Sequence, residues 1–352
     1  MTIQQINWGI IGCGNVTECK SGPAFNKVTG SKLVAVMRRS AEKARDYAAR
    51  HRVPKWYDRA DRLINDPEVN AIYVATPPDT HAHYTHLAAQ AGKPVYVEKP
   101  MALNHEECLE MIATCEKTRV PLFVAYYRRR LPNFLKVRDL IEAGAIGACR
   151  LVTLHLWRPL GDHERDRENL PWRLIPEIAG GGHFVDLASH QFDFLDYLFG
   201  PISQVRGLAT NQSGTYGVED SVSAAFQFAS GIIGSGSWCF STAGLCQRDQ
   251  IEIVGTAGRI TFSTFDHAVP IRLETDQGIE TFDIPVPEHI QQPLIETVCR
   301  ALQGADGNPC PSTGISGART TWVLDQILRD WRRAQGSNDI ESGRISVGMP
   351  ES

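Results

Sequence analysis

The sequence predicts an α/β protein of two domains. A doubly wound domain built on a parallel sheet comes first, and an α+β domain with a large, mostly antiparallel sheet follows it. With 352 residues, the chain is longer than one ordinary hydrophobic core. Short apolar runs alternate with helical stretches up to residue 125, which is typical of parallel βαβ units. From residue 149 the strands become longer and alternate apolar with small or polar residues. We therefore expect domains at residues 1–125 and 126–352.

The first strand of the parallel sheet, residues 6–11, leads into a glycine-rich loop. In the pattern G-x-G-x-x-G/A, the first glycine allows a tight turn and the second lets the backbone approach a pyrophosphate. Thr17 takes the place of the last small residue, and Pro23 is expected to break the next helix near residues 21–22. Because the loop follows a strand and precedes another, it predicts a Rossmann dinucleotide-binding domain. The expected cofactor contacts are Gly12, Gly14, Asn15 and Val16.

The second strand, residues 32–37, is followed by Arg38, Arg39 and Ser40. A domain that prefers NAD(H) would place Asp or Glu here to bind the ribose hydroxyls. Two guanidiniums and a hydroxyl suit a 2′-phosphate instead, because arginine donates paired hydrogen bonds to phosphate. The sequence therefore favours NADP(H) over NAD(H).

A central strand, residues 70–75, ends in a loop that we expect to lie over the cofactor, since ligands of such sheets bind beyond the carboxyl ends of the strands. Asp79 or Thr80 is expected to cap the following helix, which Gly92 ends. The nearby histidines have mixed spacing and no acidic cluster, so we expect no metal site. The expected cofactor contacts of this loop are Thr76, Pro77, Pro78 and His81.

Glu98-Lys99-Pro100 follows the next strand, residues 94–97, and places a charged pair at the end of a buried strand. A lysine held at this edge can donate a proton or polarise a carbonyl group. A surface ion pair at a strand exit is the alternative.

Residues 180–190 are the second informative stretch, and they open with three glycines that let the backbone pass close to a ligand. In the following helix Asp186 and His190 are four residues apart and share a face, with His183 one turn earlier. A carboxylate and an imidazole over a pocket form a candidate proton-handling pair. An Asp–His pair that only stabilises the helix is the alternative.

The remaining pattern of the second domain is a large sheet covered by helices. The expected strands are residues 150–158, 203–211, 218–228, 231–240, 250–254 and 258–262, with others up to 284, and the closing helices lie near 288–302 and 315–334. The charged insert 161–173 reads equally as a flap over the substrate and as a solvated loop. The expected substrate contacts are Lys99, Tyr126, Trp172, Arg173, Asp186 and His190.

Composition excludes several classes of protein. A net charge of -4 gives no support for nucleic acid or an anionic membrane as partner. No apolar run reaches transmembrane length, and the N-terminus has no basic segment of a signal peptide. The 9 cysteines include no Cys-x-x-Cys pair, so we expect reduced thiols in a cytoplasmic protein.

Together, the glycine loop, Glu98-Lys99-Pro100 and the Gly-Gly-Gly-x-x-x-Asp186-x-x-x-His190 stretch resemble the glucose–fructose oxidoreductase, inositol dehydrogenase and rhizopine-catabolism (Gfo/Idh/MocA) family. The resemblance covers nearly the whole chain. It implies that Lys99 is the catalytic lysine, that Glu98 holds it near the nicotinamide ribose, and that Asp186 and His190 line the substrate site. It also implies a homodimer or homotetramer formed through the outer face of the large sheet.

The expected reaction is hydride transfer between NADP(H) and a secondary alcohol or ketone of a sugar, cyclitol or related polyol. His190 is our first choice for the acid/base, with Lys99 stabilising the alkoxide, and the two roles can be exchanged. Asp186 would orient His190 or bind a substrate hydroxyl. Two alternatives use the same fold: a non-catalytic regulator that senses a dinucleotide, and a glycosidase that retains NAD.

Overall fold

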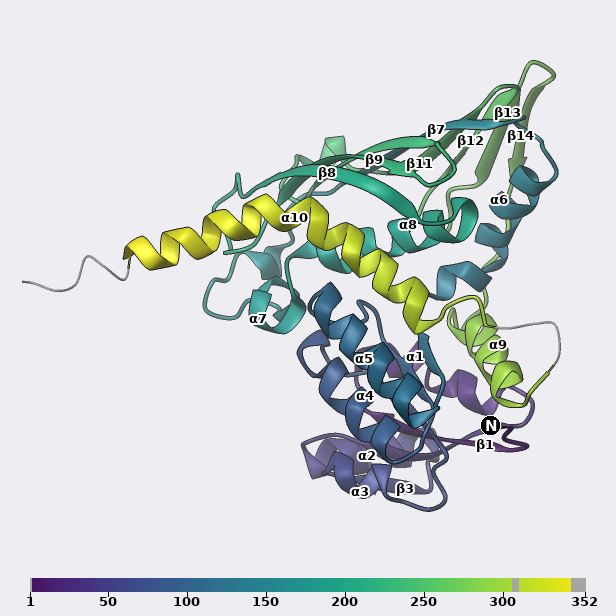
Figure 1. Cartoon of the computed structure of the whole chain (residues 1–352), viewed down its shortest axis with the longest axis vertical. Coiled ribbons are helices and arrows are strands. Elements are labelled where there is room, and N and C mark those ends of the chain that lie inside the picture. The colour runs from purple at the N-terminus through teal and green to yellow at the C-terminus, as the bar shows by residue number, and fades with distance from the viewer. Residues whose placement is uncertain (1, 306–309, 343–352) are drawn as a thin grey trace, which may run out of the picture.

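The computed structural model describes residues 2–305 and 310–342, so that residues 306–309 and 343–352 of the predicted second domain lie outside the described residues. Within this part of the chain, the strands form one sheet of six and one of eight. In Figure 1 the smaller sheet and its helices occupy the lower half, and the larger sheet lies across the top.

The six-stranded sheet is parallel throughout and has the strand order β3-β2-β1-β4-β5-β6. The strand order reverses direction between β1 and β4, which is where doubly wound sheets bind dinucleotides. The predicted Rossmann arrangement is therefore confirmed. The strands are β1 (Ile6–Ile11), β2 (Ser31–Met37), β3 (Lys55–Tyr57), β4 (Ala71–Val74), β5 (Val95–Val97) and β6 (Leu122–Val124).

Local signals explain where most helices of this half begin and end. Ser40 caps α2 by accepting from the Lys43 N–H, and Asn104 caps α5 by accepting from the Glu107 N–H. The predicted side-chain cap of α4 is wrong, because the Thr80 hydroxyl donates to Thr76 and to the Pro77 carbonyl instead. The helices are α1 (Asn15–Cys19), α2 (Ala41–His51), α3 (Ala60–Ile64), α4 (His81–Gln90) and α5 (His105–Thr118).

The eight-stranded sheet is antiparallel except for one parallel pair, β7 with β10. One of its faces packs on α8 (His183–Phe199) and α10 (Gly314–Ser342), while the opposite face is open in Figure 1. Its other flanking helices are α6 (Pro132–Glu142) and α7 (Pro176–Ala179). The strands are β7 (Cys149–Trp157), β8 (Ile202–Thr210), β9 (Ser221–Phe228), β10 (Ile233–Cys239), β11 (Arg248–Gly255), β12 (Gly258–Phe262), β13 (Ile271–Thr275) and β14 (Gly278–Phe282).

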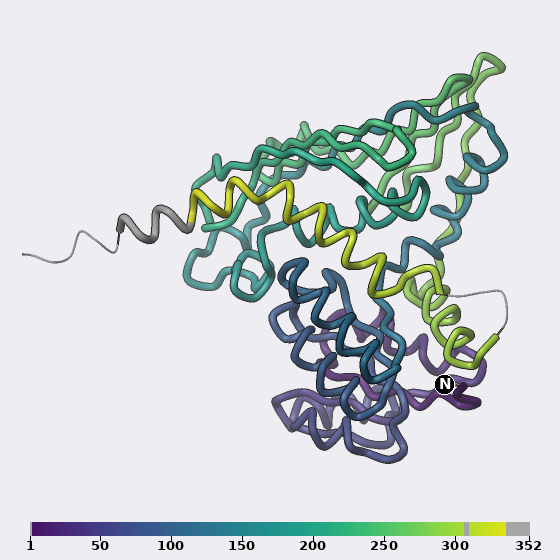
Figure 2. The backbone as a smooth tube through the Cα atoms, in the orientation of Figure 1, coloured from purple at the N-terminus to yellow at the C-terminus, as the bar shows by residue number. Residues whose placement is uncertain are grey.

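After the large sheet, the chain returns to the first sheet. Helix α9 (Gln292–Leu302) lies beside the N-terminal strand, as the tube of Figure 2 shows, and Ile3 N–H donates to the Leu302 carbonyl. Buried Leu294, Ile295 and Val298 of α9 belong to the same hydrophobic cluster as Trp8 of β1. Sequence position alone assigns α9 to the second domain, whereas the helix packs both on the first domain and on the 3₁₀ turn Tyr127–Arg130.

None of the helices in residues 2–305 and 310–342 is long and apolar enough to cross a bilayer.

Candidate active site

The glycine loop is held at the carboxyl edge of the parallel sheet. Gly12 has a φ of +93°, and a Cβ there would lie 2.8 Å from the Thr76 backbone nitrogen, so only glycine fits. Thr17, the departure from the pattern, is buried, and its hydroxyl donates to the Gly14 carbonyl at 2.8 Å. Helix α1 ends at Cys19, and Pro23 begins a separate 3₁₀ turn, which confirms the predicted break.

The edge of the sheet beside this loop fits a dinucleotide. A Cβ at Gly14 would meet only the Gly12 carbonyl oxygen, at 3.9 Å, so the backbone at the second glycine is open to a ligand. Arg38 and Arg39 follow β2 as predicted, and Arg38 Nη1 reaches the Cys13 carbonyl at 3.4 Å. Ser40 uses its hydroxyl as the helix cap.

His81 braces the loops around the site. Its imidazole is fully buried, with Nδ1 2.9 Å from the Pro100 carbonyl and Nε2 2.8 Å from the Thr76 carbonyl. Because both ring nitrogens are engaged, the predicted cofactor contact of His81 would have to be made without them. The ring instead ties the loop after β4 to the segment after β5, where Lys99 lies.

Glu98 does not pair with the side chain of Lys99. Its carboxylate accepts from the Tyr73 hydroxyl at 2.5 Å, from Gln291 Nε2 at 2.6 Å and from the Lys99 backbone N–H at 3.1 Å. The predicted alternative of a surface ion pair is wrong, since Glu98 is buried. Glu98 therefore holds the backbone of Lys99 and leaves its ammonium group free for another partner.

That partner is Asp186 of α8. Lys99 Nζ donates to Asp186 Oδ1 at 2.6 Å and to the Asp186 carbonyl at 2.9 Å, and Arg173 Nε donates to Oδ2 at 3.1 Å. Burial would raise the pKa of Asp186, but the charges of Lys99 and Arg173 outweigh it and hold that pKa at about 2. Asp186 is ionised at neutral pH. The predicted orientation of His190 by Asp186 is wrong.

His190 lies in an aromatic environment with no carboxylate partner among the described residues. Its ring meets those of Tyr127, Phe265 and Tyr126 edge-on at 5.3, 6.0 and 6.1 Å. Nδ1 is buried without a hydrogen-bond partner, while Nε2 has none either and is not among the buried atoms. Burial and the charges of Arg128, Lys99 and Lys20 hold the pKa of His190 well below its usual value. It is a neutral imidazole that presents Nε2.

Gly180, the first of the three glycines before α8, brings the two halves of the candidate site together. Gly180 has a φ of +76°, and a Cβ there would lie 2.6 Å from the Leu103 carbonyl oxygen, four residues after Lys99 in the chain. We expected close approach to a ligand here. The glycine instead allows close packing between α8 and the segment after β5, which places Asp186 within reach of Lys99.

Comparison with protein families agrees with this arrangement. The model described as "Oxidoreductase family, NAD-binding Rossmann fold" matches residues 6–126, and the C-terminal domain model of the same Gfo/Idh/MocA family matches residues 134–261. The protein belongs to the Gfo/Idh/MocA oxidoreductase family. It is an NAD(P)-dependent oxidoreductase that acts on CH–OH groups.

Relatives of this Gfo/Idh/MocA protein cover nearly its whole length. "Oxidoreductase P35" of Formosa agariphila is 38% identical over 91% of this chain and 98% of its own. A 1,5-anhydro-D-fructose reductase of Ensifer adhaerens is 31% identical over 90% and 92%. A levoglucosan dehydrogenase solved with NADH has the same fold, with a TM-score of 0.84 at 24% identity over 94% of this chain and 98% of that one.

Sequence reasoning missed several residues of this Gfo/Idh/MocA site. Glu164, in the charged insert, is buried and lies 2.8 Å from His183 Nε2 and 2.6 Å from Arg158 Nη2, so the insert is anchored beside α8. Gln291 was missed as well, and Arg128 was not named, although the run 126–130 that contains it was expected to affect specificity. Glu164 and Gln291 had no sequence signal, because a single Glu or Gln is indistinguishable from a solvated one. Tyr126 is buried, and Trp172 stacks under the Arg173 guanidinium at 4.3 Å.

Proposed function

We propose that the protein transfers hydride between NADP(H) and a secondary alcohol or ketone of a sugar, cyclitol or related polyol. One observation carries the proposal. The Lys99–Asp186 ion pair joins the end of β5 to α8, so a proton donor from one domain meets a carboxylate from the other at the edge where the dinucleotide fits. The regulator and glycosidase alternatives are not favoured by the family or by its named relatives.

The proposed roles of Lys99 and His190 are the reverse of our first choice. Bound nicotinamide accepts or supplies the hydride. In reduction, Lys99 Nζ gives a proton to the forming alkoxide, and in oxidation the neutral amine takes the hydroxyl proton. Asp186 keeps the ammonium group in place and stabilises its charge. His190 binds the same substrate oxygen through Nε2. It does so as a neutral ring, because protonation would place an unpaired N–H at buried Nδ1.

The proposed preference for NADP(H) rests on Arg38 and Arg39. Arg39 is exposed and has no ion-pair partner in the described part of the chain, and the end of β2 carries no acidic residue to bind ribose hydroxyls. The guanidinium of Arg39 and the nitrogens of Arg38 other than Nη1 are therefore available for a 2′-phosphate.

Self-association is proposed through the open face of the large sheet, as a homodimer or homotetramer. Leu151 and Ile233 are neighbours in register on β7 and β10, and Leu208 is 80% exposed on β8. Such exposed apolar side chains favour a protein interface. We further propose that the protein works in the cytoplasm, without nucleic acid or membrane as partner, and that its domains divide between residues 125 and 126.

The test is a panel of sugars, inositols and ring ketones incubated with pure protein and each oxidised or reduced cofactor. Formation or loss of reduced nicotinamide with at least one polyol or its ketone is expected. Cofactor binding without turnover of any compound would instead support a regulator. Cleavage of a glycoside without net cofactor reduction would support the glycosidase alternative.

A further inference from the structure

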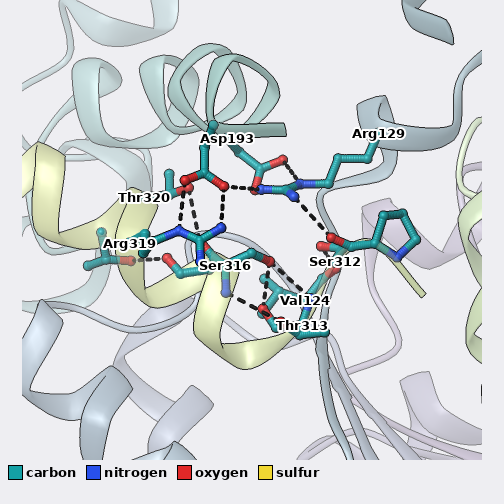
Figure 3. Close-up of polar contacts among 12 residues, drawn as sticks. Val124, Arg129, Asp193, Ser312, Thr313, Ser316, Arg319 and Thr320 are labelled. Atoms are coloured by element: carbon teal, nitrogen blue, oxygen red, sulfur yellow. Dashed lines mark hydrogen bonds and ion pairs between the residues drawn. The ribbon is translucent and has the colours of Figure 1, made fainter. Parts of the chain in front are cut away.

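Two adjacent arginines of the 3₁₀ turn Tyr127–Arg130 are equally buried but differently paired. Arg129, 3% exposed, donates two hydrogen bonds to Asp193 at 2.8 and 2.7 Å and one to Asp196 at 3.0 Å (Figure 3). Arg128, 2% exposed, donates only from Nε to the Thr264 carbonyl at 3.0 Å. Arg128 has no ion-pair partner among the described residues.

The charge of Arg128 is compensated only in part by its surroundings. Its guanidinium lies over the rings of Phe265 and Tyr127 at 4.7 and 5.0 Å. The carboxylate that contacts the same loop, Asp249, is already engaged by the Ser263 hydroxyl and by the N–H groups of residues 264–266. Burying a cation without a counter-ion costs free energy of folding. The environment of Arg128 therefore indicates that a negatively charged ligand binds there.

Arg128 and His190 are neighbours. Both side chains contact the same two rings, Tyr127 and Phe265, and the charge of Arg128 acts on His190. Each buries one nitrogen without a partner, Nη1 of Arg128 and Nδ1 of His190. Each also has a second nitrogen, Nη2 and Nε2, that lacks a hydrogen bond and is not among the buried atoms. These two free nitrogens are therefore available to one ligand.

The neighbouring charges that lower the pKa of His190 are all positive. Arg128, Lys99 and Lys20 act on His190, and Asp186 is the carboxylate already bound by Lys99 and Arg173. Lys20 follows α1 of the glycine loop, where the phosphates of a dinucleotide would balance it. Arg128 belongs to the turn after β6 and packs against the loop after β12, not against the glycine loop. Its counter-charge is therefore expected from the substrate and not from the dinucleotide.

We propose that Arg128 binds a carboxylate of the substrate, and that the substrate class is therefore an acidic polyol such as a uronate or an aldonate. This rests on the proposed function. The planar guanidinium can donate paired hydrogen bonds to a carboxylate. A bound carboxylate would also neutralise the charge of Arg128, which has no ion-pair partner among the described residues. His190 and the Lys99–Asp186 pair then act on a hydroxyl of the same molecule.

The test compares acids with the neutral sugars that differ from them only at one carbon. The pairs are D-galacturonate with D-galactose and D-glucuronate with D-glucose, assayed as kcat/KM in both cofactors. The wild-type enzyme is expected to favour the acid of at least one pair by roughly tenfold or more. Arg128→Met should lower kcat/KM for that acid roughly 30-fold or more, because the substrate carboxylate loses its buried cation, and should lower kcat/KM for the neutral sugar by a clearly smaller factor. Arg128→Lys should be intermediate.

Arg129→Lys is the matched control, since it disturbs an equally buried arginine of the same turn. It should lower the melting temperature without changing the ratio of acid to neutral sugar. Equal kcat/KM for acid and neutral sugars in the wild type, or equal losses for both in Arg128→Met, would overturn the inference. If no sugar reacts, the proposed function fails on this panel, and calorimetric titration of the uronates into NADPH-saturated protein still decides the inference. Binding that Arg128→Met abolishes would support it, and binding that is absent or unchanged by the substitution would overturn it.

Discussion

Two clusters of charged side chains lie at the junction of α8 with the rest of the molecule, and they differ in how completely they are paired. Around Arg129, the carboxylates of Asp193 and Asp196 receive Arg129 and Arg319, with contacts of 2.7–3.0 Å (Figure 3). Nearer the start of α8, Asp186 pairs with Lys99. His190 of the same helix, and Arg128 beside it, keep unpaired nitrogens.

The difference separates structure from function. The Arg129 cluster is closed: its ions neutralise one another, and it ties α8 and α10 to the turn after β6. The cluster of Lys99, Asp186, His190 and Arg128 is open, because nitrogens of His190 and Arg128 have no partner in residues 2–305 and 310–342. Native proteins pair nearly all buried polar groups, so an open cluster indicates a place for a ligand.

Substitution of Lys99 should give the largest effect in the open cluster. Lys99→Ala should reduce turnover about 1,000-fold, because it removes the proton donor and leaves Asp186 without its main counter-charge. NADPH affinity, measured by fluorescence titration, should stay within a few-fold of wild type. Unchanged turnover would remove Lys99 from the chemistry.

Arg129 tests the closed cluster. Arg129→Met should destabilise the protein by about 3–5 kcal/mol, because it leaves two buried carboxylates with one cation fewer. Urea unfolding measures this loss. The corresponding change in the open cluster, Arg128→Met, should cost clearly less stability, and an equal or larger cost would show that both clusters are structural.

Half-buried Arg38 and exposed Arg39 extend the comparison to cations that solvent reaches and that have no ion-pair partner among the described residues. Replacing both with Ala should weaken NADPH roughly 10- to 100-fold more than NADH, since charge-assisted hydrogen bonds to the 2′-phosphate are lost. Dissociation constants for the two reduced cofactors provide the measurement. Equal losses for both would contradict the proposed preference for NADP(H).

His190 gives the smallest expected effect and concerns pH. Since burial and nearby cations lower its pKa, His190 stays neutral as the pH falls through 6.5, the usual histidine value. The profile of log kcat against pH should therefore show no inflection near that pH. His190→Gln should slow turnover by roughly tenfold, the value of one hydrogen bond, and keep the shape of the profile. An acid limb near pH 6.5 that disappears in the variant would make His190 the proton carrier after all.

The sequence alone predicted the fold, and it named the residues around which the candidate site is built. The glycine loop, the alternation of strands and helices and the Glu98-Lys99-Pro100 motif depend on local spacing, which the chain displays directly. These signals located Gly12, Lys99, Asp186 and His190 without any knowledge of contacts.

Only the tertiary structure decided which of these residues are partners. Spacing of four along α8 suggested that Asp186 serves His190, but Gly180 brings α8 against the segment after β5, and Lys99 takes the carboxylate instead. In the same way, Arg128 and Arg129 are indistinguishable as neighbours in a basic run. Pairing depends on which side chains the folded backbone brings within about 3 Å of one another, and residues far apart in the chain supply those contacts.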